Sequence, residues 1–179
     1  EESHASVELY RNSKGLCINR ISKPPPKKPL VDSTEWIIAT SGTTKTPKLV
    51  RHTLSTLTRT TKVDLNESLY FHWGLAYDLF RFSGLQVFLQ SICSGSKLVL
   101  PDDVTNLQDV LNLFESKGVN IISATATYWR KFLMYEASKN IHLKRITLGG
   151  EIADDQIINA LIARYPNSKV THIYASTEV

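Results

Sequence analysis

Apolar residues alternate between two spacings along most of this chain. Short apolar runs have the length of β-strands, and the stretches between them carry apolar residues every three or four positions, as helices do. The predicted strands cover residues 36–39, 49–52, 69–71, 97–100, 119–123, 145–148 and 169–174. The predicted helices cover residues 53–63, 75–90, 107–114, 127–138 and 154–165. Strands that alternate with helices imply right-handed crossovers, so we expect an α/β fold with a mainly parallel sheet flanked by helices.

The helical spacing also predicts which side chains are buried. In the helix over 75–90 they are Leu75, Leu79, Phe82, Leu85, Phe88 and Leu89, and in the helix over 154–165 they are Ile157, Ile158, Leu161 and Ile162. The strand over 97–100 is expected to be buried. Thr53 is expected to cap the helix over 53–63, and Gly118 to end the helix that begins at Leu107.

The first 35 residues follow a different pattern. Short apolar alternations at 7–10 and 16–18 each predict an edge strand. Residues 22–29 hold four prolines and three lysines, which excludes a helix and predicts an extended connector. We therefore divide the chain into an arm and Pro/Lys-rich connector over 1–35 and an α/β subdomain over 36–179.

Composition narrows the function classes. With 42% hydrophobic residues, the 179-residue chain can form a substantial core. The net charge of +4, from 21 basic and 17 acidic residues, is too modest to indicate nucleic-acid binding. Two cysteines without metal-ligand spacing favour a reducing compartment, and no signal peptide or membrane-spanning run is visible. We expect a cytoplasmic protein without nucleic-acid or membrane partners.

A polar stretch over 40–48 directly follows the predicted strand 36–39. It contains hydroxyl side chains, Gly42 and two lysines, which are donors suited to a polyphosphate. The Walker pattern is not met, because Pro47 stands where its second glycine would be and Leu49 follows Lys48. A polar turn between two strands is the alternative interpretation.

This stretch resembles the phosphate-loop signature of the adenylate-forming superfamily, which includes acyl-CoA synthetases and the adenylation domains of peptide synthetases. The matching residues are Thr40, Ser41, Gly42, Thr43, Thr44, Pro47 and Lys48. Lys45 and Leu49 depart from the signature, since the family usually has glycine at both positions. The loss of glycine at Lys45 removes access to positive φ there.

Two further segments occur in the same order as in that family. Gly149-Gly150-Glu151 resembles the segment that lines the adenine pocket, although a tight strand-to-helix turn would have the same composition. Residues 174–178 resemble its tyrosine-glycine-any-threonine-glutamate motif, with Ala175 in place of glycine. The resemblance implies that Tyr174 stacks on adenine, that Thr177 bonds the α-phosphate and that Glu178 holds Mg²⁺. A strand end followed by a helix cap is the alternative.

Weaker similarities concern the acyl substrate. Phe71-His72-Trp73-Gly74, which we expect to form the turn after a strand, resembles a segment that carries a histidine near the substrate carboxylate. Tyr77-Asp78 resembles an aromatic-aspartate pair of adenylation domains, and we rank it after His72. Core packing is an equally good interpretation of both. His52 matches a family histidine and reads as a structural donor. Because ligands lie beyond the carboxyl ends of parallel strands, we expect them at the loops after 71, 148 and 174.

The resemblance implies part of the large N-terminal domain of an AMP-forming acid–thiol ligase. Such an enzyme forms an acyl-adenylate from ATP and a carboxylic acid, then transfers the acyl group to coenzyme A or to the phosphopantetheine of an acyl-carrier protein. The catalytic residues implied are Lys48, His72, Thr177 and Glu178. The nucleotide-binding residues implied are Thr40, Ser41, Gly42, Thr43, Thr44, Lys45, Gly149, Gly150, Glu151, Tyr174 and Ala175.

The family's ribose-binding motif, hinge and C-terminal lysine domain have no counterpart in these 179 residues. We therefore expect a fragment that binds ATP weakly and does not turn over alone. The alternative is a non-catalytic nucleotide-binding or interaction module of the same fold. The particular acid, the acceptor thiol and the oligomeric state cannot be read from the sequence.

Overall fold

The computed structural model describes residues 7–12, 15–20, 34–39, 48–61, 70–102 and 105–173. The chain divides into two compact units, residues 1–60 and 61–179. The domain boundary predicted after residue 35 falls inside the first unit and stays a prediction. No helix of the described ranges is long and apolar enough to cross a membrane.

The first unit contains two antiparallel strand pairs. They are β1 (Val7–Asn12) with β2 (Gly15–Arg20), and β3 (Glu35–Ala39) with β4 (Leu49–Thr53), which is followed by α1 (Leu54–Thr58). Thr53 caps α1 as predicted: its hydroxyl accepts the Thr56 N–H at 3.2 Å, and the Thr56 hydroxyl accepts the Thr53 N–H at 2.9 Å. The helix is much shorter than predicted, because its threonines have low helix propensity.

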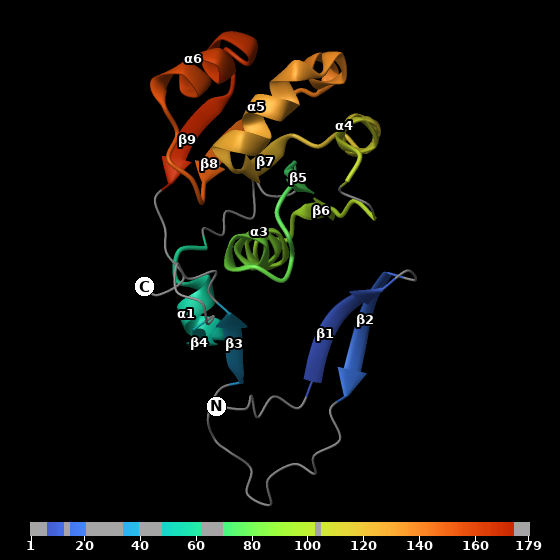
Figure 1. Ribbon diagram of the computed structural model, residues 1–179, viewed down its shortest axis with the longest axis vertical. Helices are drawn as coiled ribbons and strands as arrows, with labels where there is room; N and C mark the ends of the chain where they lie inside the picture. Colours follow the sequence, from blue (N-terminus) through green and yellow to red (C-terminus); the bar gives the residue numbers. More distant parts are fainter. Residues whose placement is uncertain are drawn as a thin grey trace, which may run out of the picture. The chain divides into compact units, whose positions relative to one another are not determined.

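The second unit is built on a five-stranded sheet. Its strands are β5 (His72–Leu75), β6 (Lys97–Val99), β7 (Ile121–Ala124), β8 (Arg145–Gly149) and β9 (Lys169–Ile173). The order is β6-β5-β7-β8-β9, and all four neighbouring pairs are parallel (Figure 1). The predicted α/β class is confirmed.

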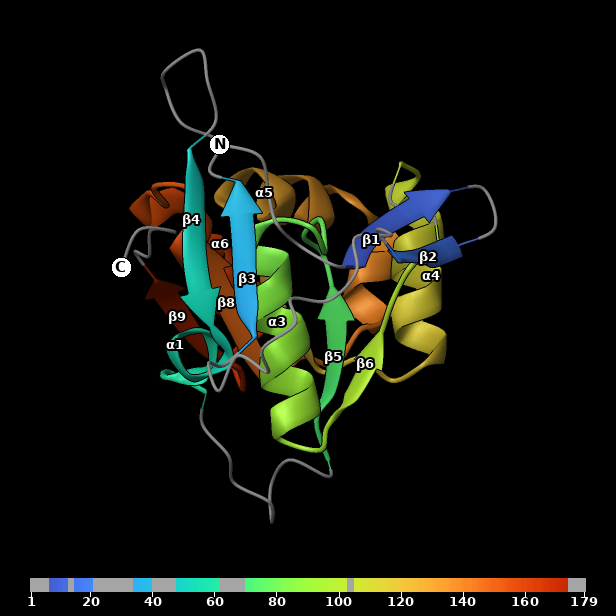
Figure 2. The ribbon, with the colours of Figure 1, turned by 90° about the horizontal axis from the view of Figure 1, so that it is seen from below.

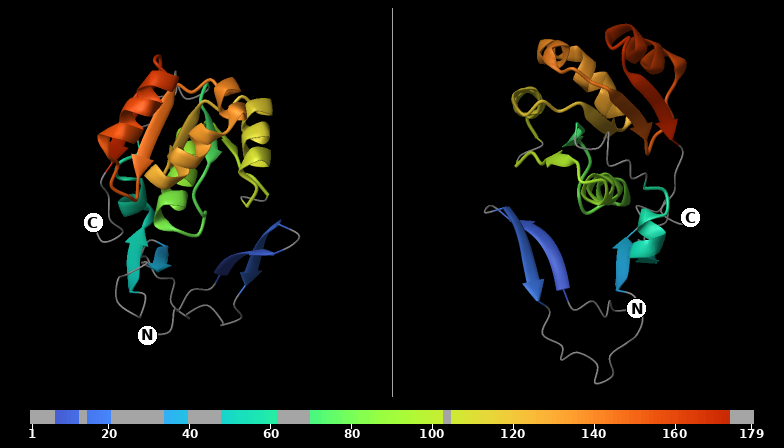
Figure 3. Two further views of the ribbon diagram at one scale, coloured as in Figure 1. Left: turned by 45° about the horizontal axis from the view of Figure 1, so that its top comes forward. Right: turned by 180° about the vertical axis from the view of Figure 1, so that it is seen from behind.

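Helices cover both faces of this sheet. One face carries α4 (Leu107–Ser116), α5 (Ala126–Met134), the 3₁₀ turn η1 (Glu136–Asn140) and α6 (Asp155–Arg164). The opposite face, turned toward the viewer in Figure 2, carries α3 (Phe82–Cys93). The two views of Figure 3 show the same layers. Gly118 ends α4 with a φ of +62°, as its position after the last apolar residue predicts.

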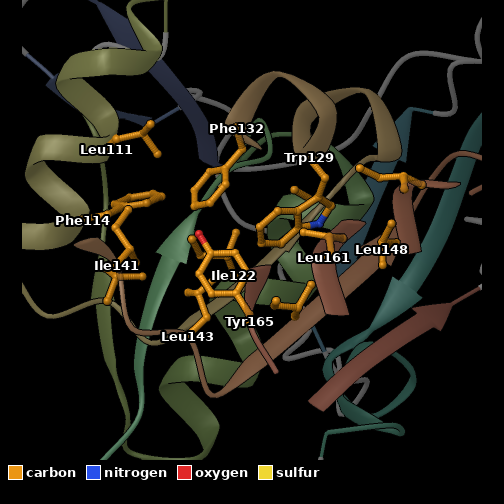
Figure 4. Packing of buried hydrophobic residues seen from close by; sticks show 14 of the residues in the cluster. Leu111, Phe114, Ile122, Trp129, Phe132, Ile141, Leu143, Leu148, Leu161 and Tyr165 are labelled. Atoms are coloured by element: carbon orange, nitrogen blue, oxygen red, sulfur yellow. The ribbon is translucent and has the colours of Figure 1, made fainter. Parts of the chain in front are cut away.

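The core lies between the sheet and the three helices of the first face (Figure 4). Trp129 and Phe132 of α5 are completely buried there, with ring centroids 5.0 Å apart in an edge-on arrangement. Two buried polar atoms of this core are paired: the Trp129 indole N–H donates to the Thr147 carbonyl at 3.0 Å, and the Tyr165 hydroxyl donates to the Ser138 carbonyl at 2.6 Å.

The segment around β5 differs from the sequence prediction. The strand was predicted at 69–71 and a helix from Leu75, but the strand is His72–Leu75 and α3 begins only at Phe82. Leu75 is buried in the sheet, where it pairs with Ser123, so its helical spacing from Leu79 is coincidental. The predicted ligand loop after residue 71 is therefore wrong, since β5 ends four residues later.

Two burial predictions are also wrong. Ile162 of α6 is 49% exposed, whereas Ile157 and Leu161 are buried as predicted. The strand β6 lies at the edge of the sheet, and Lys97 at its start is exposed. An edge strand has a partner on one side only, so it is less covered than the apolar run suggested.

Candidate functional site

The five parallel strands end along one edge of the sheet, which we call the carboxyl edge. The last strand residues are Leu75, Val99, Ala124, Gly149 and Ile173. The predicted segment Gly149-Gly150-Glu151 forms the turn that leaves β8 at this edge. Loops beyond the carboxyl ends of parallel strands are the usual ligand position in open α/β sheets.

Tyr77, in the loop after β5, reaches across to this turn. Its hydroxyl donates to the Gly149 carbonyl at 3.0 Å. A Cβ at residue 149 would lie 3.3 Å from the Tyr77 hydroxyl oxygen, so a larger residue would crowd this contact. Burial raises the pKa of the Tyr77 hydroxyl; a hydrogen bond with Ser123 opposes the rise, and the charge of Glu151 adds to it. Three segments of the chain therefore meet at the carboxyl edge: the loop after β5, the strand β7 and the turn after β8.

Glu151 holds the turn to the beginning of α5. Its Oε2 accepts the backbone N–H of Thr127 at 2.8 Å. That hydrogen bond lowers the pKa of the Glu151 carboxyl, and further hydrogen bonds with the Thr127 and Thr125 hydroxyls and the charge of Arg130 act in the same direction. A carboxylate at a helix N-terminus is favourable because it satisfies a free N–H and faces the positive end of the helix dipole.

The other end of the turn is fixed by an ion pair. Arg130 Nη2 lies 2.7 Å from Asp154 Oδ2, and Asp154 Oδ1 accepts the Ile157 N–H at 3.0 Å as the N-cap of α6. The Ile157 N–H and then the Arg130 charge lower the pKa of the Asp154 carboxyl. His172 Nε2 of β9 lies 3.4 Å from the Glu151 carbonyl oxygen.

Gly150 makes the turn possible. Its φ of +79° lies in the left-handed region, which side chains other than glycine rarely adopt. The tight strand-to-helix turn that the glycine pair predicted is therefore present. A rigid turn at the carboxyl edge can present backbone groups to a planar ligand, while the Glu151 carboxylate is already engaged by α5.

Several residues that hold the Gly149–Glu151 turn were not predicted from the sequence. They are Thr125, Thr127, Arg130 and His172. Thr125 had a visible signal, because a threonine directly before an amphipathic segment is a typical N-cap, and its hydroxyl accepts the Tyr128 N–H at 3.1 Å. The ion pair between Arg130 and Asp154 left no signal in the sequence, because 24 residues separate its partners.

His72 lies at the opposite edge of the sheet. It is the first residue of β5, its Nδ1 donates to the Lys117 carbonyl at 3.1 Å, and its backbone N–H donates to Asn120 Oδ1 at 3.0 Å. The structure does not bring it together with Gly149 and Glu151. Asp78, which we ranked after it, is at the carboxyl edge, where its Oδ1 accepts the Phe80 N–H at 2.9 Å.

Of the remaining predicted site residues, the structure describes only those in and beside β4. Lys48 is exposed directly before β4, and His52 in the same strand is only 7% exposed. Outside the described residues lie Thr40, Ser41, Gly42, Thr43, Thr44, Lys45, Tyr174, Ala175, Thr177 and Glu178. In the described part of the chain, no group of three His, Cys, Asp or Glu side chains is placed to hold a metal ion.

The chain is similar to proteins of known activity. It is 32% identical over 123 residues to a 2-succinylbenzoate–CoA ligase of Bacillus velezensis, covering 67% of this chain and 25% of that protein. It is 24% identical over 155 residues to a D-alanine–D-alanyl carrier protein ligase of Bacillus cereus, covering 82% and 31%. The chain thus spans about a quarter to a third of the length of these relatives.

A solved structure agrees with these relatives. The O-succinylbenzoate coenzyme A synthetase of Bacillus subtilis, in complex with ATP and magnesium ion, superimposes with a TM-score of 0.62 at 26% identity, covering 79% of this chain and 30% of that one. The family described as AMP-binding enzyme matches residues 2–179. The resemblance drawn from the phosphate loop and the two later motifs is confirmed, and the chain belongs to the AMP-binding enzyme family.

Proposed function

We propose that this chain is the AMP-binding part of an enzyme that activates a carboxylic acid with ATP. The observation that carries the proposal is the rigid Gly149–Glu151 turn at the carboxyl edge, held by Tyr77 and by the N-terminus of α5. The two ligase relatives support the same activity, since both names describe the joining of an acid to a thiol carrier.

The reaction needs positioning more than acid–base chemistry. A substrate carboxylate with a pKa of about 4 is ionised at neutral pH, so it can attack the α-phosphorus of ATP and displace pyrophosphate without a general base. The barrier then falls through orientation and through neutralisation of charge on the phosphates. We assign the second task to Thr43, Thr44 and Lys48. Glu178, a hard oxygen ligand, is suited to hold the Mg²⁺ that would neutralise phosphate charge.

In this proposal, residues at the carboxyl edge orient the bound nucleotide and the acid. Tyr77 fixes the Gly149 carbonyl, and Glu151 fixes the turn against α5, so the backbone between them cannot adjust freely when adenine binds beside it. Asp78 follows Tyr77 in the chain and Ser123 is its hydrogen-bond partner, and we propose both as contacts of the acid. We leave His72 out of this proposal because it lies at the other edge of the sheet.

The acceptor is coenzyme A or a carrier-protein phosphopantetheine, as the names of the two relatives suggest. We place the protein in the cytoplasm, which the paucity of cysteines favours. The competing proposal is a non-catalytic nucleotide-binding module. It is motivated by Lys45, Leu49 and Ala175, which replace glycines of the family pattern; Leu49 is 51% exposed at the start of β4.

Two measurements separate these proposals. Calorimetry with MgATP tests binding by the 179-residue chain, and carboxylate-dependent ATP–pyrophosphate exchange tests chemistry across a panel of acids. Exchange is measured on the chain alone and on the chain joined to the remaining sequence of a ligase relative. Exchange that is abolished by Glu178→Ala supports the enzyme. ATP binding without exchange on any acid, in both forms, supports the module, and the absence of any ATP signal would refute both.

A further inference from the structure

The loop between β8 and α6 is tied to neighbouring elements at both ends. It spans residues 149–154, and we call it the β8–α6 loop. The Tyr77 hydroxyl and the Glu151 carboxylate hold its beginning. Its end is tied to α5 by the ion pair in which Arg130 Nη2 lies 2.7 Å from Asp154 Oδ2. Arg130 therefore anchors the part of the loop that lies beyond the candidate turn.

Burial does little to fix this second half of the loop. The Ile152 side chain is apolar and yet 85% exposed. Ala153 packs against the core, but its single methyl group buries a small apolar area. The position of the second half therefore depends on its polar anchors more than on the hydrophobic effect.

Arg130 acts on both carboxylates of the loop. The Thr127 N–H lowers the pKa of the Glu151 carboxyl most, and the charge of Arg130 adds to that effect. The charge of Arg130 also lowers the pKa of the Asp154 carboxyl, after the larger effect of the Ile157 N–H. The helices α5 and α6 lie side by side over the sheet (Figure 1). One guanidinium group on α5 thus attracts two carboxylates of the loop that leads into α6.

The ion pair contributes little to folding. The Arg130 and Asp154 side chains are 44% and 56% exposed, and solvent weakens ion pairs at such positions. Asp154 caps α6 through its other carboxylate oxygen, because Oδ1 accepts the Ile157 N–H at 3.0 Å. Removal of the Arg130 charge should therefore leave the cap and the core intact, and change mainly the freedom of the β8–α6 loop.

We propose that Arg130 is a positioning residue for the nucleotide, which it affects by holding the β8–α6 loop without touching the ligand. This inference rests on the proposed function, in which adenine binds beside the Gly149–Glu151 turn. A loop that is already fixed loses less conformational entropy on binding, so the ligand binds more tightly. The effect should reach any ligand that contains adenine, including neutral adenosine, because it does not depend on phosphate charge.

The test compares variants that remove the ion pair from either side. Arg130→Gln removes the cation, and Asp154→Asn removes the anion but keeps a good N-cap for α6. Lys131→Gln is the matched control, because Lys131 is the next residue of α5 and is exposed outside the loop. The affinity of the 179-residue chain is measured for MgATP by calorimetry and for adenosine by NMR titration.

We expect Arg130→Gln and Asp154→Asn each to weaken the binding of both ligands at least about threefold, and Lys131→Gln to leave it unchanged. The double variant Arg130→Gln/Asp154→Asn should be no weaker than either single variant, because all three lack the same contact. Arg130→Lys keeps the charge and should recover part of the affinity. Amide hydrogen exchange of residues 150–153 should be faster in Arg130→Gln than in Lys131→Gln without any ligand, at nearly unchanged stability in urea.

Equal affinities of Arg130→Gln and Lys131→Gln would overturn the inference, and so would equal exchange rates of the loop amides. Weaker binding of MgATP with unchanged binding of adenosine would also overturn it, because Arg130 would then act through the phosphate charge. The proposed function is judged on the native chain. If the native chain binds neither ligand, the proposed function fails and this inference with it; if it binds both and Arg130→Gln binds them equally well, only this inference fails.

Discussion

The Glu151 carboxylate accepts the backbone N–H of Thr127 at 2.8 Å and thereby joins the turn after β8 to the first turn of α5. The Thr125 hydroxyl caps the next free N–H, that of Tyr128, at 3.1 Å. Two of the unpaired donors at the start of α5 are therefore satisfied from different directions. This contact connects the stability of a helix with the shape of the candidate site.

Replacement of Glu151 should test that connection. Glu151→Ala removes the acceptor and should lower the free energy of unfolding by about 1 kcal/mol, the usual cost of losing a cap. Glu151→Gln keeps an oxygen acceptor and should lose less than half of that. Urea unfolding measures both variants. Equal losses for alanine and glutamine would mean that the hydrogen bond to Thr127 contributes nothing.

The same contact should depend on pH. Because the pKa of Glu151 is lowered in the folded protein, by the Thr127 N–H first, its contribution to stability is complete above the unfolded value of about 4.3 and is lost as pH falls through the folded value. The stability difference between the native chain and Glu151→Gln should therefore shrink below about pH 4. Urea midpoints between pH 6 and pH 3 test this; a constant difference over that range would contradict it.

The loop that carries Tyr77 is packed against a glycine of α3. A Cβ on Gly84 would lie 2.6 Å from the Asp78 carbonyl carbon and 2.9 Å from the Leu79 Cα. Alanine would improve helix propensity by about 1 kcal/mol, but backbone cannot move aside as a side-chain tip can, and overpacking costs about 1–3 kcal/mol. We expect Gly84→Ala to be destabilising in thermal unfolding, whereas Ser83→Ala on the same helix should have little effect. A stabilised Gly84→Ala would show that the loop can move away.

Prediction from the sequence was most accurate where the spacing of apolar residues along a single helix determines which side chains are buried. In α4, the apolar residues Val110, Leu111 and Phe114 are buried in the core, as their helical spacing predicted. It failed around β5, where Leu75 and Leu79 have helical spacing by coincidence. Only the pairing of Leu75 with Ser123, 48 positions later, reveals the strand. That pairing was invisible in a single sequence.

In the candidate site, too, contacts between segments distant in the sequence could not be predicted. The Gly149-Gly150-Glu151 segment was found through its resemblance to a family segment, and the tight turn that its glycines allow is present, with a φ of +79° at Gly150. The partners that hold it come from distant segments and leave no local mark; Arg130 and Tyr77 are examples. His72 was ranked above Asp78, but position along the strand decides which edge of the sheet a residue occupies, and His72 begins β5 whereas Asp78 follows its end.

The hydrogen bond from Tyr77 to Gly149 can be tested separately. Tyr77→Phe removes the hydroxyl and should cost about 0.5–1.5 kcal/mol in urea unfolding, since it leaves a half-buried carbonyl without its donor. Tyr70→Phe is the matched control, because that tyrosine is 68% exposed and should lose almost nothing. Equal stability of the two variants would indicate that Gly149 finds another donor.

Lys48 provides the last prediction, which concerns the nucleotide. A lysine ammonium that contacts phosphate oxygens forms charge-assisted hydrogen bonds worth about 1.5–3 kcal/mol, and every 1.4 kcal/mol changes affinity about tenfold. Lys48→Ala should therefore weaken MgATP binding at least about tenfold in calorimetry, and Lys48→Arg should weaken it less because the charge remains. Lys131→Ala removes an exposed lysine of α5 and controls for net charge. If Lys48→Ala and Lys131→Ala bind MgATP equally well, Lys48 does not contact the phosphates, and the assignment drawn from the phosphate loop fails at the residue on which it most depends.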